Sequence, residues 1–243
     1  MLYIRKTDPP AEVVRQISKI KGMPEWRRVR EGDTSLLRAK FNELDKNVLR
    51  AALLSDQSYL CAYCMRKIQN EDNTVIEHWY PLSKDKNAAL DYQNMLAVCD
   101  GGTKNSKNGI LCCDKAKAEQ EITITPLKKS HMKKIAYDKN GFIRIEPGDE
   151  VFEHDIEVLK LNGYWKNGKF KADTATGLVK GRSDAYKRCE RFIRKLDREK
   201  KCTSSQIKKK VDEIENAEQK PEFAGVLLYF LNKKYQTLLK RGL

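Results

Sequence analysis

Apolar residues in the first sixty positions recur at helical spacing. They lie three or four positions apart from 13 to 20, ahead of Gly22 and Pro24, and again from 36 to 53. This period is typical of helices that bury one face. The pattern therefore predicts an amphipathic helical arm over residues 1–57, which packs on the rest of the chain and to which we assign no catalytic role.

The pattern changes from residue 58 to residue 130. Short β-prone pieces at 75–76, 96–98 and 122–124 are separated by Asn, Asp and Gly, and five of the seven cysteines lie here. Farther on, two β-branched and aromatic runs flank Asn140-Gly141, which predicts a β-hairpin over residues 135–145. We expect a compact core over 58–130, followed by a third region over 131–243.

The third region is mainly helical by its spacing. A helical pattern covers residues 153–161, a Gly- and Asn-rich stretch at 162–177 predicts a loop, and a long helix is expected to begin after Ser183. The fold class that these elements predict is α+β.

Composition is that of a folded chain. The 243 residues are 40% hydrophobic and 34% charged, enough for one sizeable core. The longest apolar run, residues 223–231, is shorter than a bilayer crossing needs, and Arg5, Lys6 and Asp8 stand where a signal peptide would be apolar. We expect a soluble, cytoplasmic protein with no membrane partner.

Net charge favours a polyanionic partner. Lys and Arg number 48 against 34 Asp and Glu, giving +14, and residues 180–243 carry +9 of this surplus. The helix expected after Ser183 places basic residues beside its apolar stripe, and Arg188, Arg191 and Lys195 are our candidate nucleic-acid contacts there. A solvated basic face is the alternative interpretation of the same pattern.

The cysteines indicate a metal site. Cys61 and Cys64 have the spacing that lets two thiolates reach one zinc ion, and Cys99 with Cys113 or Cys112 could supply the other two ligands. An odd number of cysteines in an intracellular chain argues against a disulfide framework. Buried free thiols or a redox pair remain the alternative, because the second half lacks the two-residue spacing.

Between these cysteines, the β-prone piece at 75–76 runs directly into Glu77 and His78, with Pro81 shortly after. Taken alone, such a pair is more often a structural hydrogen-bonding or ion-pairing arrangement than a catalytic one.

In chain order these motifs resemble the zinc-containing HNH (ββα-metal) endonucleases. The residues that carry the resemblance are Cys61-x-x-Cys64, Ile76-Glu77-His78 with Pro81, Tyr92-x-Asn94-x-Leu96, Cys99 and Cys113-Asp114-x-x-Lys117. Over residues 48–127 the chain more narrowly resembles the PtuB subunits of Septu anti-phage systems, which also accompany some retrons. It departs from them at Cys112, where relatives usually carry histidine, and at Ala118, where a glycine often follows the lysine.

The resemblance implies a ββα nuclease core with a structural zinc and a catalytic Mg²⁺ or Mn²⁺. His78 would be the general base, because imidazole accepts a proton near neutral pH. Asn94 would position the histidine loop. Glu77 and Asp114 would supply oxygen ligands to the catalytic metal, and Lys115 and Lys117 would contact phosphate.

The resemblance also implies partners and a role. The chain would be the toxic effector of an anti-phage system, held by a PtuA-type ATPase and in some systems accompanied by a retron reverse transcriptase with its RNA–DNA product. Two alternatives stay open: a ribonuclease acting on structured RNA such as tRNA, and a non-catalytic zinc-bound module that binds nucleic acid or a protein.

Overall fold

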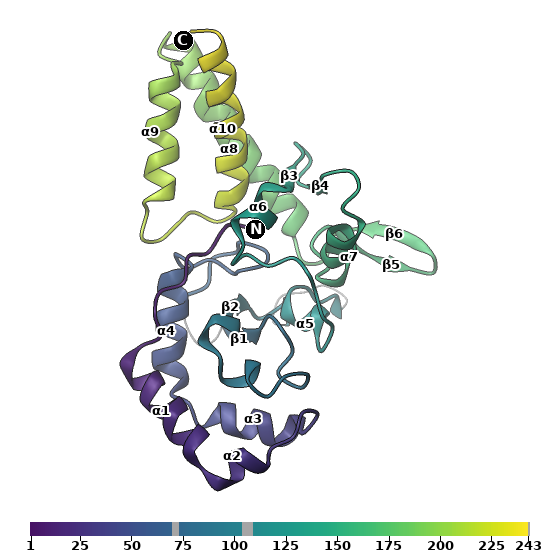
Figure 1. Ribbon diagram of the computed structural model, residues 1–243. Helices are drawn as coiled ribbons and strands as arrows, with labels where there is room; N and C mark the ends of the chain where they lie inside the picture. The colour runs from purple at the N-terminus through teal and green to yellow at the C-terminus, as the bar shows by residue number, and fades with distance from the viewer. Residues whose placement is uncertain (70–72, 104–108, 243) are drawn as a thin grey trace.

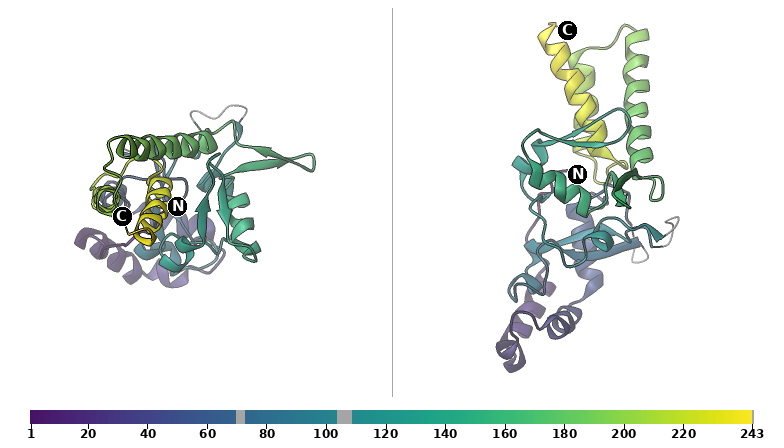
Figure 2. Two further views of the ribbon diagram at one scale, coloured as in Figure 1. Left: turned by 90° about the horizontal axis from the view of Figure 1, so that it is seen from above. Right: turned by 90° about the vertical axis from the view of Figure 1, so that its right-hand side faces the viewer.

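The computed structural model describes residues 1–69, 73–103 and 109–242, and combines helices with short antiparallel strand pairs (Figure 1). The amino-terminal helices lie at one end of the molecule, the first strand pair lies in the middle, and the long carboxy-terminal helices lie at the other end (Figures 1 and 2). Buried apolar side chains from Met1 to Leu238 form one continuous core cluster. The division into three regions stays a prediction.

The amino-terminal arm is helical as its spacing predicts. Its helices are α1 (Ala11–Gly22), α2 (Pro24–Arg28), α3 (Thr34–Asn42) and α4 (Lys46–Asp56). The apolar pattern over 36–53 is divided between α3 and α4, because the Asp45 carboxylate accepts hydrogen bonds from Asn47 N at 2.9 Å and Val48 N at 3.1 Å and begins a new helix.

The central region is built on one antiparallel strand pair. β1 (Thr74–His78) pairs with β2 (Met95–Cys99), and the register places Thr74 opposite Cys99 and His78 opposite Met95. Every residue of β2 is buried, so this strand lies inside the molecule. Two short 3₁₀ helices, η2 (Ala88–Leu90) and η3 (Tyr92–Asn94), precede β2. The single-turn helix α5 (Asp114–Lys117) follows it in the chain.

The prediction of a strand at 122–124 is wrong. Thr123 N and Ile124 N donate hydrogen bonds of 2.8 and 2.6 Å to Oδ2 of Asp155, in the helix α7 (Glu150–Val158). Because this side chain satisfies the two backbone amides, the β-branched residues need no partner strand.

The hairpin predicted at Asn140-Gly141 is confirmed. β3 (Ile135–Tyr137) pairs with β4 (Ile143–Ile145), after the short helix α6 (Lys129–Lys133). The loop predicted over 162–177 is partly wrong, since β5 (Gly163–Lys166) and β6 (Lys169–Ala172) form a further hairpin there.

The carboxy-terminal region is helical, as predicted. Its helices are α8 (Leu178–Arg198), α9 (Ser204–Glu215) and α10 (Ala224–Lys240). α8 begins before Ser183, earlier than predicted, and α10 packs against both α8 and α9 (Figure 2). Among the described residues, no helix combines the length and apolar character that a bilayer crossing requires.

Candidate functional site

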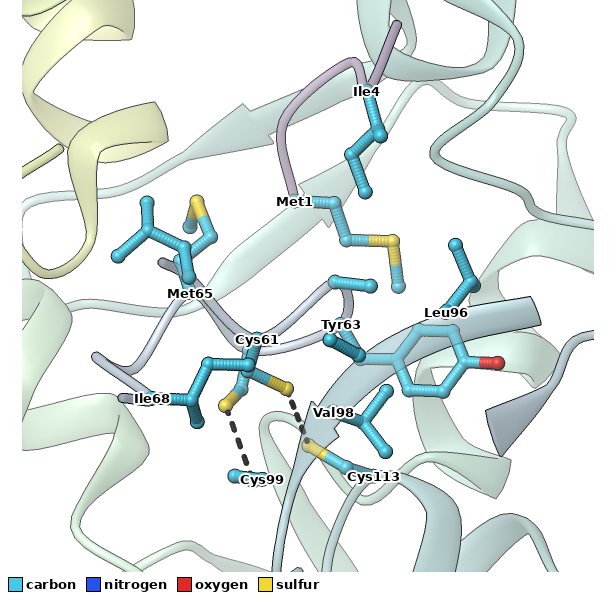
Figure 3. Close-up of a cluster of buried hydrophobic side chains, with 14 of the residues drawn as sticks. Met1, Ile4, Cys61, Tyr63, Met65, Ile68, Leu96, Val98, Cys99 and Cys113 are labelled. Atoms are coloured by element: carbon cyan, nitrogen blue, oxygen red, sulfur yellow. Dashed lines mark hydrogen bonds between the residues drawn. The ribbon is translucent and has the colours of Figure 1, made fainter. Parts of the chain in front are cut away.

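Four buried cysteines converge at the centre of the molecule. The sulfur atoms of Cys61, Cys64, Cys99 and Cys113 all lie within 4.8 Å of one another. Cys61 Sγ is 3.9 Å from Cys113 Sγ, and Cys64 Sγ is 3.7 Å from Cys99 Sγ. Figure 3 shows the sulfurs of Cys61 and Cys113 directed at each other among buried apolar side chains.

Backbone hydrogen bonds bring these cysteines together. The turn between Cys61 and Cys64 is closed by Cys61 N, which donates to Arg66 O at 2.8 Å, and is tied to β2 by Ala62 N, which donates to Ala97 O at 3.1 Å. Cys99 ends β2, and Cys113 immediately precedes α5. The cluster therefore joins the turn, the strand pair and the short helix.

The spacing of the sulfurs fits a tetrahedral zinc ion. Zn–S bonds of about 2.3 Å place the sulfurs of such a site about 3.8 Å apart, close to the two measured separations. Burial raises the pKa of the Cys64 thiol well above its ordinary value. The four cysteines could hold one zinc ion, whose charge would stabilise the thiolate forms that burial disfavours.

Cys112 lies beside this group but outside it. Its sulfur points to Gly101 O at 3.6 Å, and its backbone N donates to the same oxygen at 2.9 Å. Residues 104–108 of the long insert between Cys99 and Cys113 lie outside the described residues.

A pocket of about 440 Å³ adjoins β1 and α5. β1 contributes Glu77 and His78, and α5 contributes Asp114. Arg38 and Phe41 of α3 complete one wall, so the amino-terminal arm contributes to the pocket. Sequence analysis did not identify these two residues, because helical spacing does not show which face meets a pocket.

Glu77 forms a buried ion pair on the floor of this pocket. Its Oε1 lies 2.7 Å from Nζ of Lys117 and accepts a 3.3 Å hydrogen bond from the Tyr63 hydroxyl. Burial, with a smaller contribution from the Asp114 carboxylate, raises the pKa of Glu77 to about 8 despite the nearby ammonium. Glu77 and Asp114 are thus close enough to interact, as two ligands of one cation would be.

Lys117 is not the surface lysine that we expected. Its side chain is 1% exposed, and Nζ also donates to His78 O at 3.1 Å. The ammonium therefore contacts a carboxylate and a carbonyl inside the protein, and the role of Lys117 as a phosphate contact stays a prediction. Lys115, in contrast, has a side chain that is 42% exposed and lies 3.6 Å from Asp114.

His78 is held in one orientation. Nε2 donates a 3.0 Å hydrogen bond to Ala89 O, and the ring meets Phe41 edge-on with centroids 4.7 Å apart. Burial lowers the pKa of His78 to about 4, so the imidazole is neutral near pH 7. Because a carbonyl only accepts, Nε2 carries the proton and Nδ1 keeps its lone pair.

Asn94 fastens the segment that follows His78. Its Oδ1 accepts from Tyr80 N at 2.8 Å, and its Nδ2 donates to Tyr80 O at 2.9 Å and to Ala88 O at 3.0 Å. Ala88 precedes Ala89, the residue that accepts the hydrogen bond from His78. One buried amide thus holds both sides of the loop around the imidazole.

The basic residues predicted in the tail all lie on α8 and are exposed. Arg188 donates to Glu222 O at 3.2 Å, and Lys195 lies 3.9 Å from Glu199. These contacts leave the side chains at the surface.

No family model matches the chain. A relative from Escherichia coli, described as "Retron Ec83 putative HNH endonuclease", is 35% identical over 83 residues, which are 30% of this chain and 32% of the relative. The chain thus spans about a third of the length of the relative that it matches. The similarity supports an HNH nuclease family for the matched segment, and the four-cysteine cluster could hold a zinc ion.

Proposed function

We propose that this protein is a metal-dependent HNH endonuclease that hydrolyses phosphodiester bonds. The observation that carries the proposal is the convergence of Glu77, His78 and Asp114 on one pocket beside a four-cysteine cluster. The partial similarity to a retron-associated HNH endonuclease supports it.

In this mechanism His78 is the general base. The hydrogen bond from Nε2 to Ala89 O leaves Nδ1 free to accept a proton from the attacking water. Asn94 positions the imidazole through its hydrogen bonds around the same loop.

Glu77 and Asp114 would hold the catalytic divalent cation. Carboxylate oxygens are the ligands that Mg²⁺ and Mn²⁺ prefer. When bound, the cation would neutralise charge on the phosphate in the transition state. Lys117 keeps Glu77 fixed in place through the buried ion pair. The zinc held by the four cysteines would be structural, since every ligand position is taken by the protein.

Nucleic acid would be bound by exposed basic residues. Lys115 borders the pocket, while Arg188, Arg191 and Lys195 form a basic face on α8 that extends the binding surface. The net charge of +14 favours this class of substrate.

The same resemblance supports a role as the nuclease effector of a PtuAB-type anti-phage system. A PtuA-type ATPase would be its partner, and a retron reverse transcriptase with its RNA–DNA product would accompany it in some systems.

The decisive experiment compares His78→Ala with wild type on plasmid DNA, single-stranded DNA and tRNA, with Mg²⁺ or Mn²⁺. We expect loss of cleavage by about 10²-fold or more with unchanged zinc content, because the imidazole acts on the attacking water. His154→Ala is the matched control, because His154 is exposed on α7. This variant should cleave nucleic acid as wild type does.

Retained cleavage in folded His78→Ala protein would refute the assignment of the base. Cleavage of tRNA alone would identify the substrate as structured RNA. Zinc-loaded wild type that cleaves nothing would instead support a non-catalytic module.

A further inference from the structure

The hairpin of β5 and β6 projects from the body of the molecule near α7 (Figures 1 and 2). Its strands pair from Gly163 opposite Ala172 to Lys166 opposite Lys169. The two connecting residues both have positive φ, as a type I′ turn requires, with 51° at Asn167 and 68° at Gly168. This ribbon is therefore a well-defined tight hairpin.

The ribbon displays two large aromatic side chains. Trp165 and Phe170 lie opposite each other, with ring centroids 5.7 Å apart, and are 58% and 42% exposed. Both project from the same face, because residues paired across a hairpin share one face. Two adjacent rings left in solvent are typical of a binding surface.

The rest of the ribbon is basic. Residues 160–172 contain four lysines and no acidic residue, although the region 131–179 has no net charge. The lysines are Lys160, Lys166, Lys169 and Lys171. Within the described part of the chain, no ion pair joins any of them to another residue. Their charge is thus free to meet an anionic partner.

The base of the ribbon is firmly anchored. The buried Arg182 guanidinium donates to Leu161 O at 2.6 Å and to Asn162 Oδ1 at 3.2 Å, just before β5 begins. Just after β6, the buried Asp173 carboxylate accepts a 2.6 Å hydrogen bond from Leu178 N at the start of α8. Both ends are therefore fixed, while the aromatic pair remains exposed.

The chain just before the ribbon also contacts a residue beside the candidate catalytic pocket. Cys113 N donates a 3.0 Å hydrogen bond to Leu159 O, four residues before the ribbon begins. Cys113 immediately precedes Asp114, which lines the pocket. The segment that leads into the ribbon is thus hydrogen-bonded to the backbone beside the pocket.

We propose that the β5–β6 ribbon is a nucleic-acid-binding arm, which stacks Trp165 and Phe170 on unpaired bases while its lysines contact phosphates. Stacking on aromatic rings combined with basic side chains is how proteins bind single strands without reading sequence. The inference rests on the proposed nuclease function, since it assigns the arm to the same substrate. It specifies a substrate that has a single-stranded or unpaired segment.

The test measures binding of labelled single-stranded DNA and RNA of equal length by fluorescence anisotropy. The full chain carries His78→Ala, so that the probe is not cut. Trp165→Leu with Phe170→Leu keeps apolar bulk but removes both π faces, and should weaken binding by about 10-fold or more. Trp165→Phe with Phe170→Tyr is the matched control and should bind within about twofold of the parent protein.

A second variant tests the charges. Lys166→Gln, Lys169→Gln and Lys171→Gln together should weaken binding and flatten its salt dependence, while the corresponding arginine triple should keep both. These exposed positions leave the fold intact, which circular dichroism and zinc content check.

The outcomes separate the two proposals. If wild type cleaves nucleic acid but the leucine and glutamine variants bind as tightly as their parent, the arm is refuted and the nuclease stands. If the variants lose only binding to an ATPase partner, the ribbon is a protein-docking surface and the inference is overturned. If wild type neither binds nor cleaves any probe, both proposals fail.

Discussion

Cys112 and Cys113 are neighbours in the chain, yet the four-sulfur group includes Cys113 and not Cys112. The sulfur of Cys113 lies 3.9 Å from that of Cys61, whereas the sulfur of Cys112 points to Gly101 O at 3.6 Å. Cys113 has a φ of 55°, an uncommon conformation for a residue with a side chain. This backbone turn brings Cys113 into the four-sulfur group and leaves Cys112 beside it.

The two cysteines should therefore differ in their effect on zinc. Cys113→Ser should lose zinc and much of the folded structure, because the metal lacks a ligand that joins α5 to the strand pair. Cys112→Ser should retain about one zinc per chain. Measuring the zinc content of both variants, purified without chelator, tests this prediction. Equal zinc loss in the two variants would contradict the assignment of Cys113, rather than Cys112, as the fourth ligand.

Lys117 should contribute to stability through Glu77. Lys117→Met removes the ammonium 2.7 Å from the carboxylate, so above about pH 8, where Glu77 is ionised in the wild type, the buried group must stay charged without its partner or take up a proton. We expect the free energy of unfolding to fall by about 3–5 kcal/mol, measured by urea denaturation at a pH above 8.

Lys115→Met is the matched control, because the Lys115 side chain is 42% exposed. Its unfolding free energy should stay within about 0.5 kcal/mol of wild type. Lys117→Met combined with Glu77→Gln should recover most of the loss, since the buried negative charge is gone. A double variant as unstable as Lys117→Met alone would show that the ion pair is not the cause.

The pair of Glu77 and Lys117 also shows where sequence analysis ends. The β-prone piece leading to Glu77 was recognised because apolar residues in a short run predict a buried strand. The sequence does not indicate that Lys117 is the partner of Glu77, because the two residues are 40 positions apart and lysine is usually exposed. Only the packing of α5 against β1 brings the charges together.

The two Asn-Gly pairs make a similar point about turns. Asn140-Gly141 was predicted as a hairpin because β-branched and aromatic residues flank it. Asn167-Gly168 forms a tighter, two-residue turn between β5 and β6, but the lysines that flank it are not typical of strands, so the sequence predicts a loop there. The Asn167-Gly168 pair is itself typical of a hairpin turn, but the lysines on either side of it do not fit the usual strand pattern. The three lysines of the ribbon do not show in the net charge of residues 131–179, which is zero.

Asn94 should affect activity more than zinc content. Asn94→Asp keeps an acceptor for Tyr80 N but cannot donate to Tyr80 O or Ala88 O, so the loop around His78 loses two hydrogen bonds. We expect a loss of stability of about 2–3 kcal/mol and a fall in cleavage rate that persists well below the melting temperature. Equal cleavage rates at equal folded fraction would exclude a positioning role for this amide.

The basic residues on the exposed face of α8 should strengthen the binding of nucleic acid. Reversal of Arg188, Arg191 and Lys195 to Glu should weaken binding of nucleic acid and reduce the steepness of its salt dependence. A control with the same change in net charge reverses exposed residues of α1, namely Arg15, Lys19 and Lys21. Titrations at several salt concentrations compare the two triples, and identical curves would indicate that α8 acts only through overall charge.

Ala118 is a site where one substitution should stabilise the protein. It follows α5 with φ 51° and ψ −125°, a conformation that glycine adopts without strain and alanine does not. Ala118→Gly should therefore raise the unfolding free energy by about 1 kcal/mol, after the greater freedom of glycine in the unfolded chain is subtracted.

Ala116, two residues earlier and inside α5, is the matched control. Its conformation is helical, so Ala116→Gly relieves no strain and should destabilise the protein by about 0.5–1 kcal/mol. Urea denaturation of both variants gives the comparison, and the opposite signs are the informative result. If both glycine variants were destabilised alike, the backbone at Ala118 would carry no strain, and the alanine there would be an ordinary helix-end residue.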